Sequence, residues 1–206
     1  MTENRLPLIA ILRGITSREI VGIGEALVGA GVEYIEVPLN SPDPFSSIEM
    51  LIASCGQHAV CGAGTVLTVE QVERLANSGA KLVVSPHTNE KLIAAAVEKS
   101  MLVYPGVATV SEAIRAIDAG AEQLKLFPAG DIGAGYLSSI KEVLPKRVPL
   151  YAVGRIGLQE LELFWRAGAR GFGIGSGLYR PGDKPAEVAH KAEQYVTRVK
   201  ELWESS

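Results

Sequence analysis

The sequence feature that most constrains the fold is a short glycine motif that recurs after four helix-like segments. It reads Ala30-Gly31-Val32, Ser78-Gly79-Ala80, Ala119-Gly120-Ala121 and Ala167-Gly168-Ala169. Each glycine follows residues with helical periodicity and precedes a short apolar run. Because a glycine in the left-handed conformation commonly ends a helix, each copy predicts a helix that leads directly into a strand.

The apolar runs between the helical segments predict eight strands. They cover Pro7–Arg13, Val32–Leu39, Ala59–Val66, Lys81–Pro86, Met101–Val107, Gln123–Pro128, Pro149–Val153 and Arg170–Ile174. Capping-box patterns at Thr16–Glu19, Thr68–Gln71 and Thr109–Glu112 predict helix starts, as do Asp43-Pro44 and, less regularly, Asp183 with Pro185. Eight strands alternating with about eight helices predict a compact (β/α)8 TIM barrel.

We expect residues 1–206 to form this barrel as a single catalytic domain. The 47% of hydrophobic residues and 21% of charged residues are typical of a soluble globular protein with a sizeable core. An open doubly wound sheet is the alternative architecture, but neither a G-x-G-x-x-G nor a Walker A loop supports it. The sequence contains no low-complexity tract or linker that would indicate a second domain.

Composition also narrows the classes of partner. A formal charge of −3 provides no excess positive field for nucleic acid. No apolar stretch approaches the roughly 20 residues that a membrane helix needs, and the run Leu6–Leu12 is too short for a signal peptide. The two cysteines, Cys55 and Cys61, occur in ordinary segments. Reduced thiols are the default for such cysteines, and the sequence therefore predicts a cytoplasmic protein.

Three predicted strands carry a charged residue within an apolar run. Arg13 ends the first strand, Glu36 lies in Tyr34–Leu39, and Lys125 lies in Leu124–Pro128. Alternation along each strand directs Glu36, and Lys125 together with Phe127, toward the barrel interior. Isolated buried charges are costly, and ion pairs that serve packing alone are often replaceable by apolar residues. We therefore interpret these residues as functional rather than as a structural salt-bridge network.

A buried lysine has a specific chemical use. Its ordinary pKa is about 10.4, and burial or a neighbouring cation lowers it, which leaves a nucleophilic amine that condenses with a ketone. Arg13 could lower this pKa and could also bind a carboxylate through two hydrogen bonds. With Glu36 as general acid/base and Thr65 as a small polar contact, the pattern predicts a Schiff-base lyase that acts on a 2-oxo acid.

The loops after the last two strands predict an anion site. In many barrels these loops bind phosphate through backbone amides. Here they contain Gly154-Arg155 and the run Gly173–Gly177, in which Ser176 adds a hydroxyl. Glycines are common at barrel corners, so the position after the last two strands carries the prediction.

Together these segments resemble the 2-keto-3-deoxy-phosphoaldonate aldolases. The similarity rests on Ile9–Ile15, Ile35–Pro42, Gly62–Val66 and Leu124–Pro128, and it extends from about Pro7 to Tyr179. The segment Pro38-Leu39-Asn40-Ser41-Pro42 resembles the phosphogalactonate branch, whereas the phosphogluconate branch typically has an arginine where Asn40 stands. The resemblance implies a metal-independent class I aldolase without a cofactor, usually a homotrimer. It also implies cleavage of 2-dehydro-3-deoxy-6-phosphogalactonate to pyruvate and D-glyceraldehyde 3-phosphate.

Carried over by position, the resemblance assigns a role to each site residue. It implies Lys125 as the Schiff-base lysine, Glu36 as the acid/base, and Arg13 with Thr65 at the carboxylate. It further implies a pocket lined by Pro86 and Phe127, and a phosphate held by Gly154, Gly175 and Ser176. The family usually has Gly-Gly in the strand-seven loop, but this chain has Arg155 as the second residue. The Arg155 side chain then either points to solvent or helps hold phosphate.

Three alternatives remain at this point. A sister aldolase for the phosphogluconate epimer or for 4-hydroxy-2-oxoglutarate would share the chemistry. A metal-dependent phosphosugar epimerase would need converging ligands, but only His87 of the three histidines lies at a predicted strand end. A non-catalytic barrel that serves assembly would be expected to have lost the site residues, all of which are present here.

Overall fold

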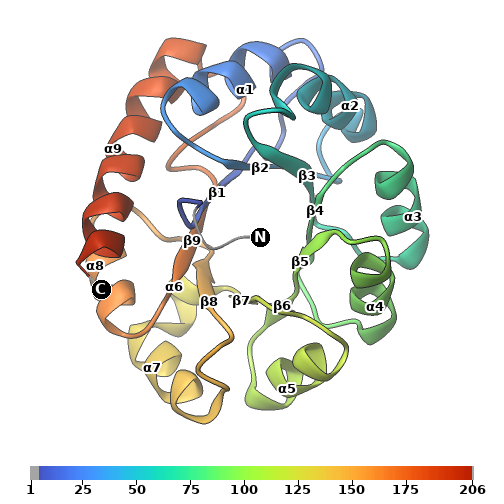
Figure 1. The fold of residues 1–206 in the computed structure, drawn as a ribbon. Coiled ribbons are helices and arrows are strands. Elements are labelled where there is room, and N and C mark those ends of the chain that lie inside the picture. Colours follow the sequence, from blue (N-terminus) through green and yellow to red (C-terminus); the bar gives the residue numbers. More distant parts are fainter. Residues whose placement is uncertain (1–4, 206) are drawn as a thin grey trace.

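The computed structural model describes residues 5–205, and its strands form one parallel sheet. In sheet order they are β5 (Leu102–Tyr104), β4 (Leu82–Val84), β3 (Val60–Gly64), β2 (Tyr34–Pro38), β1 (Leu8–Ile11), β9 (Gly171–Ile174), β8 (Leu150–Val153), β7 (Leu124–Leu126) and β6 (Gly106–Val107). All neighbouring pairs in this order run parallel. Figure 1 looks along the axis of the resulting barrel.

The barrel closes where the two ends of the strand order meet in one stretch of chain. Strands β5 and β6 are separated by Pro105 alone, which lacks the N–H that a continuous ladder requires. The Pro105 carbonyl still accepts a hydrogen bond of 2.9 Å from the Lys125 amide of β7. The (β/α)8 TIM barrel is therefore confirmed, with one difference: the strand predicted at Met101–Val107 is divided at this proline.

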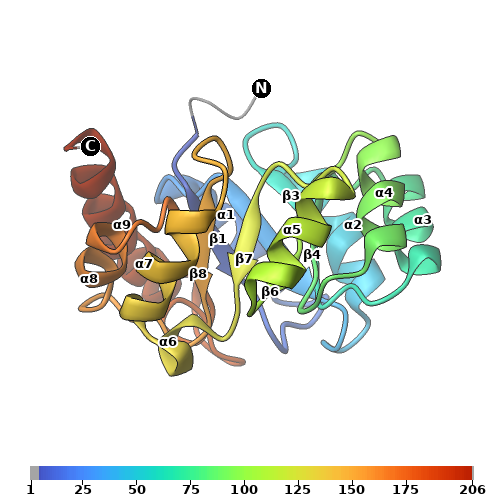
Figure 2. The same cartoon turned by 90° about the horizontal axis from the view of Figure 1, so that it is seen from below.

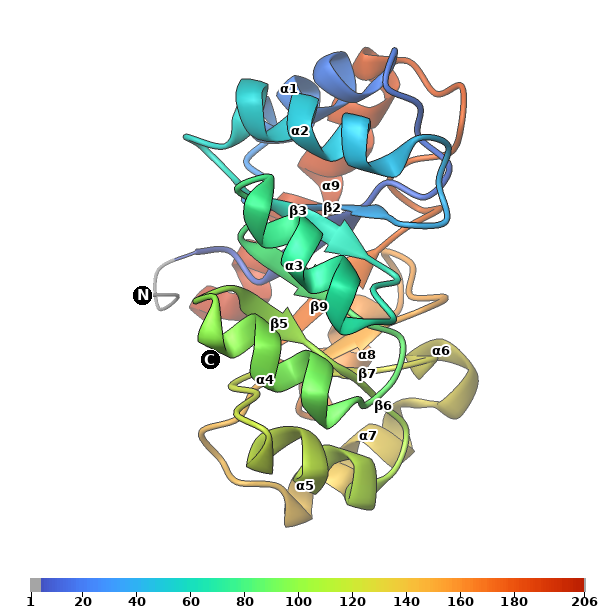
Figure 3. The same ribbon diagram turned by 90° about the vertical axis from the view of Figure 1, so that its right-hand side faces the viewer.

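The helices form the outer layer of the barrel. They are α1 (Ile20–Gly29), α2 (Pro44–Cys55), α3 (Val69–Asn77), α4 (Glu90–Glu98), α5 (Val110–Asp118), α6 (Ala129–Ile132), α7 (Ala134–Val143), α8 (Leu161–Arg166) and α9 (Pro185–Glu204). Figure 2 shows the barrel from the side, with the short helix α6 at the lower end, toward which the strands' carboxyl ends point. In Figure 3, α3, α4 and α5 lie side by side on the outer face.

The four glycines of the recurring motif end helices as predicted. Gly31, Gly79, Gly120 and Gly168 all have left-handed backbone, with φ between +83° and +109°, a conformation that glycine adopts without steric cost. The capping boxes at Thr68 and Thr109 are both formed.

Helices α2 and α9 begin at the predicted prolines, Pro44 and Pro185, but the capping contacts at three predicted helix starts differ from the prediction. Glu19 accepts hydrogen bonds from the Thr16 amide and hydroxyl, but helix α1 begins only at Ile20. Asp43 precedes Pro44 with φ +39° and caps nothing with its side chain. Lys184, not Asp183, is the N-cap of α9; Asp183 instead pairs with Lys191 at 2.7 Å.

Two separate apolar clusters confirm the alternation along the strands. Ile35, Val37, Leu124 and Leu126 pack outward in the cluster that the strands share with the helices. The second cluster fills the barrel interior: Ile9, Ile11, Tyr34, Leu82, Val84, Tyr104, Tyr151 and Val153, with Val60, Leu102 and Phe127 packed against them. Glu36 and Lys125 lie on the inward positions of β2 and β7. The interior is thus apolar except where these charged groups enter it.

Candidate active site

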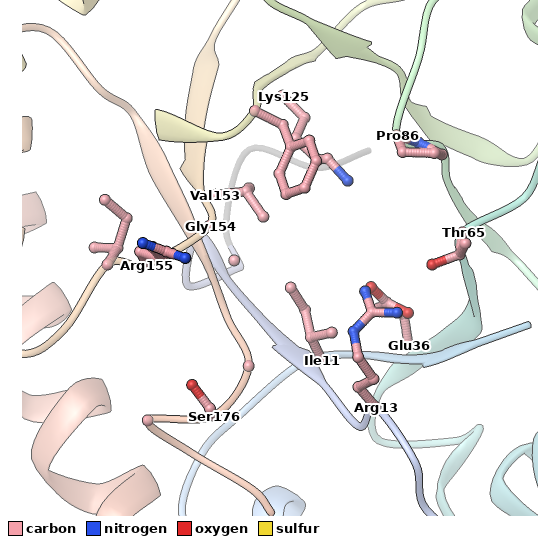
Figure 4. Close-up of a pocket in the computed structure, with 15 residues that line it drawn as sticks. Ile11, Arg13, Glu36, Thr65, Pro86, Lys125, Val153, Gly154, Arg155 and Ser176 are labelled. Carbon is pink, nitrogen blue, oxygen red and sulfur yellow. The ribbon is translucent and has the colours of Figure 1, made fainter. Parts of the chain in front are cut away.

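A cavity of about 460 Å³ opens at the carboxyl ends of the strands. Every site residue predicted from the sequence lines it: Arg13, Glu36, Thr65, Pro86, Lys125, Phe127, Gly154, Arg155, Gly175 and Ser176. These residues come from the ends of β1, β2, β3, β4, β7, β8 and β9 or the loops that follow. The barrel therefore brings together residues that lie far apart in the sequence, and Figure 4 shows them around one opening.

Glu36 and Lys125 are the two charged residues most deeply buried in the cavity, at 2% and 6% exposure. Among residues 5–205, Oε2 of Glu36 is buried and has no hydrogen-bond partner. The ammonium nitrogen of Lys125 lies 4.7 Å from the centre of the Phe127 ring, a cation–π contact rather than an ion pair. Both groups are therefore available to a bound molecule (Figure 4).

Burial shifts both groups toward their neutral forms. It raises the pKa of Glu36, because the carboxylate loses its water, although the positive charges of Lys125 and Arg13 oppose this shift. Burial also lowers the pKa of Lys125; Glu36 opposes that change, and Arg13 adds to it. The expected effect of Arg13 on the lysine is therefore present, but desolvation is the larger cause.

Arg13 and Thr65 lie at one side of the cavity, near Glu36 (Figure 4). Arg13 follows β1 and is exposed, and its Nη1 donates a 2.7 Å hydrogen bond to Oδ1 of Asn40. Thr65 directly follows β3 and has a left-handed backbone with φ +54°, which is uncommon for a β-branched residue. A guanidinium and a hydroxyl beside a buried lysine can together hold a carboxylate.

The loops after β8 and β9 form the opposite side of the cavity in Figure 4. Gly154 is left-handed with φ +95°, and Arg155 follows with φ +54°. The Arg155 guanidinium is largely exposed and lies 3.1 Å from the carboxylate of Asp131 on α6. After β9, the chain makes a turn in which the amides of Leu178 and Tyr179 donate to the Gly175 carbonyl, and Ser176 is exposed.

Five further residues line the cavity: Ile11, Val153, Ile156, Gly173 and Gly177. Gly173 and Gly177 belong to the loop that the sequence predicts as an anion site, but none of the five was predicted to have a role of its own. Strand alternation could have identified Ile11 and Gly173, because each lies two positions before a predicted site residue on the same face. A Cβ on Gly173 would lie 2.9 Å from a methyl group of Val153, so this glycine helps keep the cavity open.

Three further observations concern membrane spans, metal sites and the histidine at a strand end. No helix within residues 5–205 is both long enough and apolar enough to span a bilayer. Nor does that part of the chain bring three histidine, cysteine or acidic side chains together in a group suited to a metal ion. His87 lies after β4 with its Nδ1 buried and without a hydrogen-bond partner among the same residues.

A family model described as KDPG and KHG aldolase matches residues 2–186. The chain belongs to the KDPG and KHG aldolase family. It is accordingly an aldolase, an enzyme that makes and breaks a carbon–carbon bond. The 2-dehydro-3-deoxy-6-phosphogalactonate aldolase of Escherichia coli K12 is 42% identical over 199 residues, which cover 97% of each chain.

Solved structures of this family have the same fold. A native KDPGal structure superposes with a TM-score of 0.95 at 41% identity and covers 98% of both chains. The 2-keto-3-deoxy-6-phosphogluconate aldolase of Zymomonas mobilis ATCC 29191 superposes with a TM-score of 0.85 at 27% identity and covers 93% of both chains. The aldolase barrel is thus shared, and similarity is greater toward the KDPGal structure.

Gly64 gives a direct test of the Glu36 position in this aldolase. A Cβ at residue 64 would lie 1.9 Å from Oε2 of Glu36, so Gly64→Ala must displace the carboxylate. We expect kcat to fall by about 10²–10⁴, the usual contribution of a positioned general acid/base, while the fold persists. Steady-state kinetics and circular dichroism measure the two effects.

The matched control for this substitution is Gly29→Ala. Gly29 lies in α1, and a Cβ added there meets nothing within 4 Å. This control should keep the parent activity. A Gly64→Ala enzyme with the parent kcat would contradict the assignment of Glu36 to the reaction.

Proposed function

We propose that this chain is a class I aldolase that cleaves 2-dehydro-3-deoxy-6-phosphogalactonate to pyruvate and D-glyceraldehyde 3-phosphate in galactonate catabolism. The observation that carries the proposal is the buried Lys125 amine opposite Glu36 at the carboxyl end of the barrel. Greater identity to the KDPGal structure than to the phosphogluconate aldolase favours the galactonate epimer, as does the segment around Asn40. The substrate is a small phosphorylated 2-oxo acid, and the chemistry requires neither a metal nor an organic cofactor.

The reaction begins with attack by the neutral Lys125 amine on the C2 ketone of the substrate. Loss of water from the carbinolamine gives an iminium ion, and Glu36 moves the protons that this step requires. Glu36 then accepts the C4 hydroxyl proton, and the C3–C4 bond breaks. The bond's electron pair passes to the iminium, which becomes an enamine, and D-glyceraldehyde 3-phosphate leaves. Protonation at C3 and hydrolysis release pyruvate and free the lysine.

The remaining residues hold the two ends of the substrate. Arg13 and Thr65 bind the carboxylate next to the reacting ketone, and Pro86 and Phe127 form the walls around it. Gly154, Gly175 and Ser176 bind the phosphate through their backbone amides, with the Ser176 hydroxyl adding a hydrogen bond. In Figure 4, Arg13 and Thr65 lie on one side of the cavity, and Gly154 and Ser176 lie on the other. These positions agree with a substrate that spans the cavity.

Borohydride trapping with pyruvate tests the covalent step. Reduction should attach pyruvate irreversibly to Lys125, and mass spectrometry of a digest locates the adduct. Lys125→Met should give no adduct and no aldol cleavage, because the covalent route is lost. A stable adduct at another lysine, or none in the parent enzyme, would contradict the proposal.

The rate of borohydride trapping should also depend on pH. Only the neutral amine attacks the ketone, and burial lowers the pKa of Lys125. The trapping rate should therefore rise with pH through a midpoint below the ordinary lysine pKa of about 10.4, and it should fall as acid protonates the amine. A midpoint at or above the ordinary value would show that the cavity does not lower this pKa.

Arg155 is proposed to add a cationic contact to the phosphate. Replacement by glycine suits its left-handed backbone and removes the guanidinium, so we expect a several-fold higher KM for the phosphorylated substrate with little change in kcat. Asp131→Asn, which releases Arg155 from its ion pair, serves as the comparison and should not raise KM. An unchanged KM in Arg155→Gly would leave phosphate binding to the backbone amides alone.

We also propose that the chain assembles as a homotrimer and acts in the cytoplasm. Exposed apolar side chains, such as Val110 and Ile114 one turn apart on α5, offer surface for subunit contacts. Free, buried Cys55 and Cys61 are compatible with a reducing compartment. Analytical ultracentrifugation should give three times the mass of one chain; a monomer or dimer would contradict the trimer.

A further inference from the structure

The hydrogen bond between Arg13 and Asn40 joins two loops of the active site. Arg13 follows β1, and Asn40 follows β2; Nη1 of the arginine donates to Oδ1 of the asparagine at 2.7 Å. The next residues repeat the connection, because the Gly14 amide donates to the Ser41 hydroxyl at 2.9 Å. The first contact holds a side chain and the second holds the backbone, so the two contacts have separable effects.

The Arg13 side chain needs such a contact because it is exposed and long. An exposed arginine samples many rotamers, and fixing one of them costs conformational entropy. Its second available partner is Glu36, since Arg13 acts electrostatically on that carboxylate and Figure 4 draws the two side chains next to each other. Oε2 of Glu36 nevertheless has no hydrogen-bond partner among residues 5–205. The guanidinium is thus bonded to the neutral amide oxygen, while a carboxyl oxygen of Glu36 that has no hydrogen-bond partner among these residues lies nearby.

We propose that Asn40 is a positioning residue that holds the Arg13 guanidinium for the substrate carboxylate and keeps it from pairing with Glu36. This inference rests on the proposed function, in which Arg13 binds the carboxylate and Glu36 moves protons. An amide oxygen suits the task because it accepts a hydrogen bond without neutralising the guanidinium. Asn40 lines no part of the cavity wall and acts through Arg13 alone.

The test uses two ketones that differ in their carboxylate. Asn40→Leu removes the acceptor at similar side-chain volume, and borohydride trapping at Lys125 is measured with pyruvate and with acetone over a range of concentrations. We expect the half-saturating concentration of pyruvate to rise about tenfold, which corresponds to about 1.4 kcal/mol. Acetone carries no carboxylate, so its half-saturating concentration should be unchanged. Asn40→Asp keeps an acceptor oxygen, so its half-saturating concentration of pyruvate should be closer to the parent value than that of Asn40→Leu.

A second readout follows the acid limb of the pH–kcat profile. The charged groups that act on Glu36 are Lys125 from β7 and Arg13 from the loop after β1. If the freed guanidinium pairs with Glu36, the positive charge stabilises the carboxylate, lowers its pKa, and moves the acid limb to lower pH. A general loss of structure would lower kcat at all pH values without moving this limb.

Asp43→Asn is the matched control in the same loop. Asp43 makes no side-chain cap hydrogen bond, and its φ of +39° is one that asparagine tolerates. This variant should keep the parent half-saturating concentrations for both ketones. Suppose that the parent enzyme traps pyruvate at Lys125. If Asn40→Leu then has the parent half-saturating concentrations, or if these concentrations rise equally for both ketones, the positioning role is wrong while the proposed function stands. If the parent enzyme traps no pyruvate, the proposed function itself fails.

Discussion

One amine and one carboxyl group are buried in an otherwise apolar barrel, and the shape and chemistry of the cavity follow from them. Lys125 and Glu36 are almost fully buried, and no hydrogen bond satisfies Oε2 of Glu36 within residues 5–205. Such burial costs stability, and an apolar pair would fill the space at lower cost. The same burial shifts the pKa values of the two groups toward neutral pH, where proton transfer and imine formation are most effective.

Glycines create the space that these groups require. A Cβ on Gly64 would overlap the Glu36 carboxylate, and one on Gly171 would lie 2.2 Å from the Tyr151 ring. Gly173 similarly leaves room for Val153 at the cavity wall. The inward positions of β3 and β9 are therefore almost without side chains, while β8 fills the interior with larger ones. This complementarity keeps the amino-terminal end of the barrel packed and leaves its carboxyl end open.

The two ends of the cavity are built differently from its centre. Arg13 and Arg155 are both exposed, and each is held by a residue of another segment, Asn40 after β2 in one case and Asp131 on α6 in the other. The central groups need no such support because strand geometry and burial fix them. At the rim, where water competes for every charge, the orientation of each arginine depends on a contact with a neighbouring segment.

Local patterns in the sequence predict which residues face inward, and the types of residue found there predict Schiff-base chemistry. Alternation placed Glu36 and Lys125 in the interior, and glycine motifs marked the ends of four helices, because both signals are local properties of the chain. All of the residues carried over by resemblance line one cavity.

Contacts between segments that are distant in sequence are seen in the three-dimensional structure alone. The ion pair of Arg155 with Asp131 and the hydrogen bond of Arg13 to Asn40 could not be predicted. Each depends on how neighbouring strands and loops are placed when the barrel closes. Local patterns determine the direction of a side chain, whereas the packing of the whole chain determines its partner.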